Sequence, residues 1–255
     1  MITIALTNQK GGVGKTTTAI NLAAYMGKMD KRILLIDLDP QANSSSGFGI
    51  DKRVKKNSLY EILTDQVPIN DTVLKMESKN VYMIPSDPVL AAAEVELVSV
   101  INREFRLKKA LESVQEKFDY CIIDCPPSLS LLTINGLVAA DKVIIPVQSE
   151  FYALEGLGHL LHTIDRVKMN LNPYLDILGI VLTMYDYRTV LSHQVKEEVR
   201  KHFLDQLFDS VIPRNIRLAE APSHGKSILQ YDRFCKGASA YKNLAKEVIK
   251  RCQKD

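Results

Sequence analysis

Two lysines and three glycines near the amino terminus have the spacing of a phosphate-binding loop. An apolar segment at 2–7, typical of a buried strand, precedes them, and a segment at 18–26 with helical apolar spacing follows. The loop itself consists of Lys10, Gly11, Gly12, Val13, Gly14, Lys15, Thr16 and Thr17. Glycines let backbone N–H groups face an anion without Cβ clashes, and a helix amino terminus adds its positive end. In such a loop Lys15 is predicted to contact the β- and γ-phosphates of a nucleotide, and the Thr16 hydroxyl to bind Mg²⁺.

The loop departs from the usual pattern G-x-x-x-x-G-K-[ST]. Its first glycine would fall at position 9, which is Gln9, and an additional lysine, Lys10, follows. A second lysine beside an anion that Lys15 already neutralises is repelled unless it has an anion of its own. One solution is that Lys10 faces the nucleotide of a second subunit; the alternative is a surface lysine in a flexible turn.

Carboxylates end two further apolar segments. The segment at 31–41 ends in Asp37, Asp39 and Pro40, and the segment at 118–127 contains Asp124 before two prolines. The carboxyl ends of parallel strands face the ligand crevice of an α/β sheet. Asp124 is therefore predicted to hold Mg²⁺, directly or through water, and Asp39 to hold Mg²⁺ water or orient an attacking water. The alternative for Asp39 is a turn former at a strand end.

Strand and helix patterns alternate along the chain. Apolar strands are predicted at 2–7, 31–41, 81–85, 118–127, 142–147, 175–183 and 211–215. Helices are predicted at 18–26, 59–63 with Ser58 as N-cap, 89–100, 105–117, 151–168, 190–203 and 238–252, and an exposed loop at 42–58. This alternation predicts an α/β fold with a mostly parallel twisted sheet and helices on both faces. No repeat or linker divides the chain, which predicts a single domain over 1–255.

Composition excludes several classes of protein. Hydrophobic residues make up 46% of the 255 residues and charged residues 25%, and no apolar run approaches the ~20 residues of a membrane span. The amino terminus has no secretory signal pattern. The spacing of the four cysteines favours neither zinc nor a disulfide framework, so free thiols in a reducing cytoplasm are expected.

Charge is distributed unevenly. Residues 184–255 carry 14 Lys and Arg against 9 Asp and Glu, whereas the whole chain has a net charge of only +3. A polyanionic partner would therefore meet the last third of the chain, unless this charge is simply the solvated face of its helices.

The loop KGGVGKTT resembles the deviant Walker A loop of the ParA/MinD ATPases. DLDPQ at 37–41 resembles switch I of that family, and IIDCPPSLS at 122–130 resembles its Walker B strand and the start of switch II. The resemblance implies a P-loop NTPase fold and the cofactors ATP and Mg²⁺. It also implies that Lys10 reaches across a dimer to the partner's ATP, that Asp39 positions the hydrolytic water, and that residues 126–135 respond to the γ-phosphate.

Softer segments resemble the ParA/Soj branch in particular. They are YDYRT, VIPRNIRLAEAPSHGK and KGASAYKNLA. The resemblance implies that the turn with Pro213 and Asn215 contacts adenine, and Met184 is placed with them. Arg188 and Arg217 align with arginines that this branch uses on DNA phosphates, to which the basic helix residues Lys196 and Arg200 are added. Guanidinium suits phosphate because its donor fork is planar and permanently charged. The alternative is a surface arginine–carboxylate pair.

Three functional hypotheses follow. The first is a cytoplasmic, nucleoid-associated switch that dimerises on ATP, binds double-stranded DNA without reading sequence, and hydrolyses ATP slowly, stimulated by a ParB-like partner, to drive chromosome or plasmid partition. The second is a MinD-like ATPase that binds the membrane surface through the amphipathic helix at 238–252, although docking of that helix on the core is the favoured reading. The third is a redox relative with a bridging metal cluster, for which Cys125 would be a ligand.

Overall fold

The computed structural model describes residues 1–50, 57–150 and 153–253. Residues 51–56 of the predicted loop and Phe151, the predicted start of a helix, lie outside this part.

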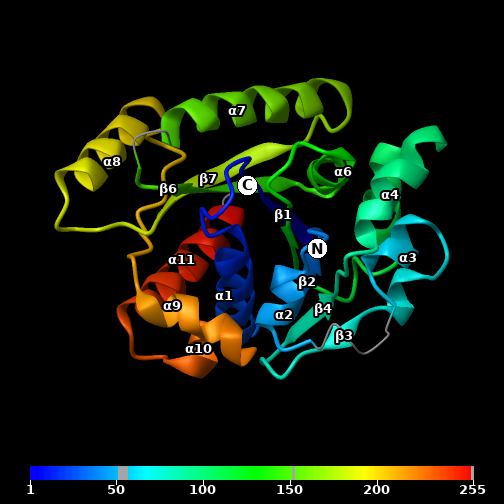
Figure 1. Ribbon diagram of the computed structural model, residues 1–255, viewed down its shortest axis with the longest axis horizontal. Coiled ribbons are helices and arrows are strands. Elements are labelled where there is room, and N and C mark those ends of the chain that lie inside the picture. The colour runs from blue at the N-terminus through cyan, green and yellow to red at the C-terminus, as the bar shows by residue number, and fades with distance from the viewer. Residues whose placement is uncertain (51–56, 151–152, 254–255) are drawn as a thin grey trace.

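A seven-stranded sheet runs through the centre of the described residues (Figure 1). Its order is β3-β4-β2-β5-β1-β6-β7, and neighbouring strands are parallel except β3 with β4. The strands are β1 (Ile2–Leu6), β2 (Ile33–Asp37), β3 (Leu74–Lys75), β4 (Val81–Ile84), β5 (Tyr120–Asp124), β6 (Lys142–Gln148) and β7 (Asp176–Thr183). The central strands β2 and β5 are buried throughout, which is why they read as unbroken apolar runs. The predicted mostly parallel sheet is confirmed.

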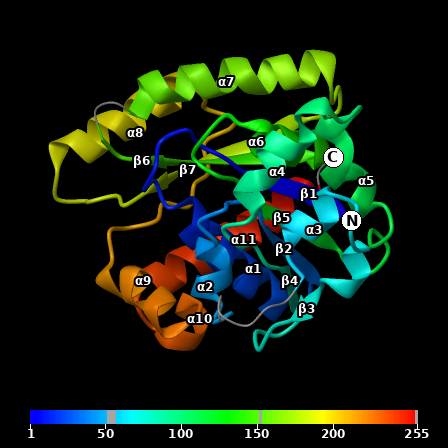
Figure 2. The ribbon, with the colours of Figure 1, turned by 45° about the vertical axis from the view of Figure 1, so that its right-hand side comes forward.

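Helices cover both faces of this sheet (Figures 1 and 2). One face packs on α3 (Leu59–Leu63), α4 (Leu90–Glu96), α5 (Arg106–Leu111), α6 (Leu131–Ala139), α7 (Ala153–Asn170) and α8 (Val190–His202). The other packs on α1 (Lys15–Lys28), α9 (Ile216–Glu220), α10 (Ile228–Tyr231) and α11 (Lys236–Cys252), with α2 (Asn43–Gly47) beside α1. Successive strand residues alternate between these two cores, as Ile122 and Ile123 do.

The strand register brings three strand ends together. In the parallel pairing, Leu6 at the end of β1 and Asp37 at the end of β2 both lie opposite Asp124 at the end of β5. The segment that follows β1 therefore leaves the sheet beside two carboxylates, at the edge where ligands bind in α/β folds.

Several local predictions were wrong. The predicted exposed loop at 42–58 contains helix α2, whose Ser44 and Ser45 are fully buried. The segment at 211–215 is not a strand but forms an isolated bridge between Tyr185 and Pro213. Helix α5 ends at Leu111, short of the predicted 117, and the two-residue strand β3 was not predicted. Elements this short are held by tertiary contacts and carry no periodicity of their own.

The amphipathic helix near the carboxyl end docks on the core. Tyr241, Leu244, Ala245 and Val248 of α11 are at most 1% exposed, and α11 packs along α1. The Tyr241 hydroxyl lies 3.1 Å from the Thr18 hydroxyl of α1. The apolar face of this helix is therefore already covered by protein.

Candidate functional site

The glycine-rich loop after β1 contains two glycines whose backbone is in the left-handed conformation. Gly12 and Gly14 have φ of 74° and 85°, a region that favours glycine. Gly14 is the N-cap of α1 and has no side chain to bond the first N–H groups of that helix. Those donors are therefore left for a ligand, and the helix dipole favours an anion there. The Thr183 hydroxyl donates to the Val13 carbonyl at 2.8 Å, which ties the loop to β7.

Lys15 is enclosed at the base of this loop. Only 7% of its surface is exposed, and its Nζ donates to the Lys10 carbonyl at 3.1 Å. Burial lowers the pKa of Lys15, while the charges of Asp124 and Asp39 act in the opposite direction. Burial disfavours the charged ammonium of Lys15, so an anion that enters the loop would stabilise it.

Asp124 has one carboxylate oxygen without a partner. Its Oδ2 accepts a hydrogen bond from the Ser44 hydroxyl at 2.7 Å, whereas its buried Oδ1 has no hydrogen-bond partner among the residues described. Burial raises the pKa of Asp124 to about 6, although the Ser44 hydroxyl, the neighbouring Thr16 hydroxyl and the charge of Lys15 act in the opposite direction. An unpartnered buried carboxylate oxygen beside a threonine hydroxyl fits a cation.

The donor set fits Mg²⁺ bound together with a phosphate ligand. No group of three or more His, Cys, Asp or Glu side chains in the described ranges could hold a metal by itself. Mg²⁺ usually takes one or two protein carboxylates and completes its shell with water and substrate phosphates. Thr16 and Asp124 therefore fit the roles predicted for them.

Asp37, one strand away, has protein donors on both carboxylate oxygens. Its Oδ2 accepts from the Ser45 backbone N–H and hydroxyl, both at 2.7 Å, and its Oδ1 from the Asp39 N–H at 3.3 Å. Burial raises the pKa of Asp37 to about 7, and the charge of Asp124 adds to the shift. The two buried carboxylates thus hold α2 through adjacent serines. Sequence reasoning missed both serines, because a short polar run gave no signal other than that of a loop.

Asp39 lies at the edge of this acidic cluster and is 8% exposed. Its Oδ1 accepts from the Gln41 N–H at 2.9 Å, so it does form a turn at the strand end. Its charge also acts on Lys15 and Asp124. The turn at Asp39 is therefore observed, whereas its role toward an attacking water or Mg²⁺ stays a prediction.

Lys10 forms an ion pair within its own subunit. Its Nζ lies 3.0 Å from Glu150 Oε2, and the two side chains are 40% and 45% exposed. Gln148 donates to the other oxygen of Glu150. In the single chain the anion beside Lys10 is thus the carboxylate of Glu150, which nothing in the local sequence marked.

A cavity of about 310 Å³ lies on the other side of the loop. Met184, Pro213 and Asn215 line it together with Gly14 and Thr17, so the structure brings the three predicted adenine contacts to the end of the phosphate loop. Met184 has φ of 50°, which turns the chain sharply after β7. Asn215 uses its Oδ1 to cap α9, accepting from the Arg217 N–H at 2.9 Å. Its side-chain amide N–H groups are the donors that remain for a ligand.

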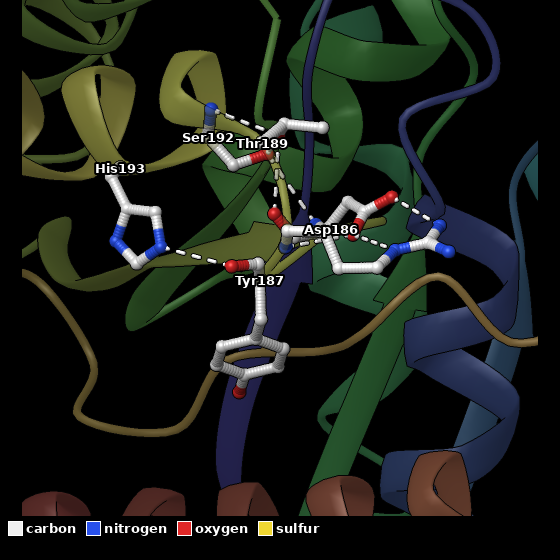
Figure 3. A network of polar contacts seen from close by, with 6 residues as sticks. Asp186, Tyr187, Thr189, Ser192 and His193 are labelled. Carbon is white, nitrogen blue, oxygen red and sulfur yellow. Dashed lines mark hydrogen bonds and ion pairs between the residues drawn. The ribbon is translucent and has the colours of Figure 1, made fainter.

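A larger groove of about 1000 Å³ lies between the segment after β7, α8 and the start of α11. Arg188 and Lys196 line it, as do Arg214 and Lys236, which sequence reasoning missed. The Arg188 guanidinium donates two hydrogen bonds to Asp186, of 2.9 and 2.8 Å, and holds the pKa of that carboxyl well below its usual range. Figure 3 shows Asp186 beside the turn that leads into α8. The surface-pair alternative for Arg188 is therefore realised in the free chain.

The other two predicted DNA contacts lie outside this groove. Arg217 on α9 pairs with Glu220 at 2.9 Å and with Asp232 at 3.7 Å. Arg200 lies exposed in the last turn of α8. The structure thus brings together only half of the four predicted cations.

Cys125 is not available as a surface ligand. It is 1% exposed, and a Cβ on Gly136 of α6 would come within 2.9 Å of its Sγ. Burial keeps the pKa of its thiol far above the usual range. A cluster bridging two subunits would need a cysteine at the surface.

The loop, the two acidic strand ends and the sheet order define a P-loop NTPase with a deviant Walker A motif. A family model described as an AAA domain matches residues 1–177. The chain is 55% identical over 245 residues to the sporulation initiation inhibitor protein Soj of Bacillus subtilis, covering 96% of this chain and 97% of that protein. It is 50% identical over 250 residues to the chromosome partitioning protein ParA of Caulobacter vibrioides, covering 97% and 94%. The chain therefore belongs to the Soj/ParA family of chromosome partitioning proteins.

Solved structures share the whole fold. Cobyrinic acid a,c-diamide synthase from Mycobacterium smegmatis, with bound ADP and magnesium, superposes with a TM-score of 0.88 at 35% identity, covering 99% of this chain and 96% of that one. A second structure of that protein holds an ATP analogue and magnesium. In the part of this chain that the structure describes, none of the helices combines the length and the apolar character needed to cross a membrane.

Proposed function

We propose that this chain, acting as a single ATPase domain, is an ATP-dependent dimerising switch for DNA partition. In the ATP state it binds DNA without reading sequence, and slow hydrolysis, stimulated by a ParB-like partner, releases it. The observation that carries the proposal is the phosphate loop set against Asp124, whose one free carboxylate oxygen lies beside Thr16 and Lys15. Family membership supports the partition role. We place the protein in the cytoplasm, on the nucleoid.

Each part of the site has a proposed task. The loop N–H groups and Lys15 hold the phosphates, and Pro213, Asn215 and Met184 hold the adenine. Thr16 and Asp124 ligate Mg²⁺, with Asp39 at its water shell. Mg²⁺, when bound, neutralises charge on the β- and γ-phosphates. Asp39 also accepts a hydrogen bond from the attacking water and so orients that water.

Lys10 is proposed to serve the second subunit. To reach a partner's nucleotide it must leave Glu150, which holds it at 3.0 Å in the single chain. An exposed pair of this kind is worth only ~0.2–1 kcal/mol, so a nucleotide phosphate readily competes for the lysine.

The proposed DNA surface combines Arg188, Lys196, Arg200 and Arg217. Because these cations do not line one groove in the single chain, we propose that the closed dimer brings patches of two subunits onto one duplex. Contacts of this kind go to phosphates, which explains binding without sequence preference.

DNA retention by Asp39→Ala tests the proposal. The variant should bind ATP but not hydrolyse it, and so stay in the closed state. We expect retention on immobilised duplex DNA with ATP and Mg²⁺ but not with ADP. Retention should weaken steeply between ~50 and ~200 mM salt, because phosphate contacts release counterions.

Charge reversal supplies the controls. Arg217→Glu and Arg188→Glu in the Asp39→Ala background should each weaken retention and reduce the salt slope by about 1. Asp209→Asn, at the same face, should not weaken it. Equal retention in ATP and ADP, or none in either, would contradict the proposal.

A further inference from the structure

We propose that the groove between the segment after β7 and α11 binds single-stranded DNA, with unpaired bases stacked on Tyr187 and Phe234. This inference rests on the proposed DNA role of the same face and names a second form of nucleic acid that it accepts. The observation is the combination of two exposed aromatic rings with four cations in one groove of about 1000 Å³.

The Tyr187 ring is exposed yet firmly held. It is 63% exposed and packs edge-on against Tyr185, with ring centroids 4.8 Å apart. Buried Tyr185 is in turn fixed by a 3.1 Å hydrogen bond to Nδ1 of His193, whose Nε2 lies 3.2 Å from the Tyr187 carbonyl. Figure 3 shows the Tyr187 ring pointing away from Thr189, Ser192 and His193. A ring fixed before binding loses little conformational entropy when a base stacks on it.

Phe234 presents a second ring two residues before α11 begins. It is 82% exposed, and its backbone N–H is anchored to Asp232 Oδ1 at 3.2 Å. The Arg233 guanidinium lies over the ring, 4.7 Å from its centroid. A guanidinium on a ring leaves the opposite side for a base and adds a positive charge for the adjoining phosphate.

The charge of the groove suits a phosphate backbone. Arg188, Lys196, Arg214 and Lys236 face two carboxylates, Asp186 and Asp209. Arg188 and Asp186 neutralise each other through two hydrogen bonds, which leaves Lys196, Arg214 and Lys236 against Asp209. The excess of positive charge therefore lies along the same groove as the rings, which is the arrangement that tracks a single strand.

The rings distinguish a single strand from a duplex. In a duplex the base faces are covered by their neighbours, so Tyr187 and Phe234 can contact only its edges and backbone. In a single strand each base offers a free face, and stacking on an aromatic ring is worth ~1–3 kcal/mol, or about 5- to 150-fold in affinity. Removing a ring should therefore affect the two ligands differently.

Fluorescence anisotropy tests the inference on the full chain with ATP and Mg²⁺. The probes are fluorescein-labelled oligo(dT) and a labelled duplex of the same length. Tyr187→Ala and Phe234→Ala should each weaken oligo(dT) binding by about fivefold or more, and duplex binding by less than about twofold. Tyr187→Phe should keep the oligo(dT) affinity. Tyr174→Ala is the matched control, because Tyr174 is 85% exposed but precedes β7, at the opposite end of that strand from the groove.

The outcomes separate this inference from the proposed function. Duplex binding without oligo(dT) binding overturns the single-strand inference and leaves the partition switch standing. If the unmodified chain binds neither oligo(dT) nor the duplex, both the single-strand inference and the proposed function are overturned. If the two ring variants lose equal affinity for oligo(dT) and for the duplex, the rings serve the duplex, and the single-strand inference is overturned.

Discussion

At the scale of single residues, Lys10 shows how an extra charge is accommodated. The structure pairs it with Glu150, so the lysine is neutralised while the chain is alone. Both side chains are nearly half exposed, which makes the pair weak and easily exchanged. The pair thus holds Lys10 near the loop without fixing it there.

Glu150→Gln should favour closure of the dimer. Without the Glu150 carboxylate, Lys10 does not have to break an ion pair before it reaches the second subunit. We expect dimer affinity with ATP and Mg²⁺ to rise by up to about fivefold, measured by sedimentation with hydrolysis blocked by Asp39→Ala. The gain should vanish when Lys10→Ala is added. A weaker dimer in Glu150→Gln would show that Glu150 itself contacts the partner.

The facing carboxylates of Asp37 and Asp124 predict how stability depends on pH. Burial raises the pKa of both, to about 7 and about 6. A carboxyl with a raised pKa binds its proton more tightly in the folded chain than in the unfolded one. This contribution is therefore complete below the ordinary value near 4 and is lost as pH rises through 6 to 7.

Asp37→Asn should stabilise the nucleotide-free protein at pH 8. The amide oxygen keeps the acceptor for Ser45 and gives up only the 3.3 Å contact with the Asp39 N–H, while one of two buried charges is removed. We therefore expect the free energy of unfolding to rise by about 1–2 kcal/mol. The gain should shrink at pH 5, as measured by urea denaturation. Asp119→Asn should show the opposite sign at pH 8, because the hydrogen bond from Arg32 lowers the pKa of Asp119. A variant less stable than the parent at pH 8 would refute the argument.

At the scale of elements, α2 connects the acidic cluster to the segment after the turn at 213–215. Ser44 and Ser45 hold its start to Asp124 and Asp37, and the residues after it meet the segment at 221–225. That meeting is a contact between two glycines, Gly49 and Gly225, with φ of 81° and 63°. A Cβ on Gly225 would lie 2.7 Å from the Gly49 Cα.

Gly225→Ala should destabilise the protein. The left-handed backbone strains any side chain, and the added Cβ would force the two segments apart, at a cost of about 1–3 kcal/mol in urea denaturation. Gly158→Ala in α7 is the opposite control, since its Cβ meets nothing within 4 Å. It should stabilise by up to about 1 kcal/mol. If Gly225→Ala has the stability of the parent, the contact between Gly49 and Gly225 can move apart without a cost in free energy.

At the scale of the whole molecule, α11 decides between the partition and membrane-surface hypotheses. An amphipathic helix that binds lipid must offer its apolar face, but this face is covered by α1. Removing the helix would expose part of the core, so the intact chain is the proper test.

Vesicle flotation and unfolding together test this placement. We expect no ATP-dependent flotation with anionic phospholipid vesicles. Leu244→Ala, at a fully buried position, should lower the free energy of unfolding by about 2–4 kcal/mol. Lys246→Ala on the exposed face of α11 is the control and should cost less than about 0.5 kcal/mol. Flotation that Leu244→Ala abolishes, with unchanged stability, would instead support the membrane reading.

Local signals in the sequence predicted much of the fold and of the phosphate site. Strands buried on both faces are recognisable as unbroken apolar runs, and a glycine loop between a strand and a helix has few other uses. The acidic residues were recognisable because strand ends share one edge of a parallel sheet. Chemistry that depends on neighbours in sequence is therefore determined by the sequence alone.

Only the tertiary structure decided which distant residues complete these groups. Ser44 reaches Asp124 across 80 positions, and Lys10 reaches Glu150 across 140. Arg214 and Lys236 joined Arg188 in one groove, whereas Arg217 did not. No pattern in a short window encodes such pairs, because they are made by the order of the strands and the packing of helices on both faces. The sequence thus determined the kind of site, and the packing determined its partners.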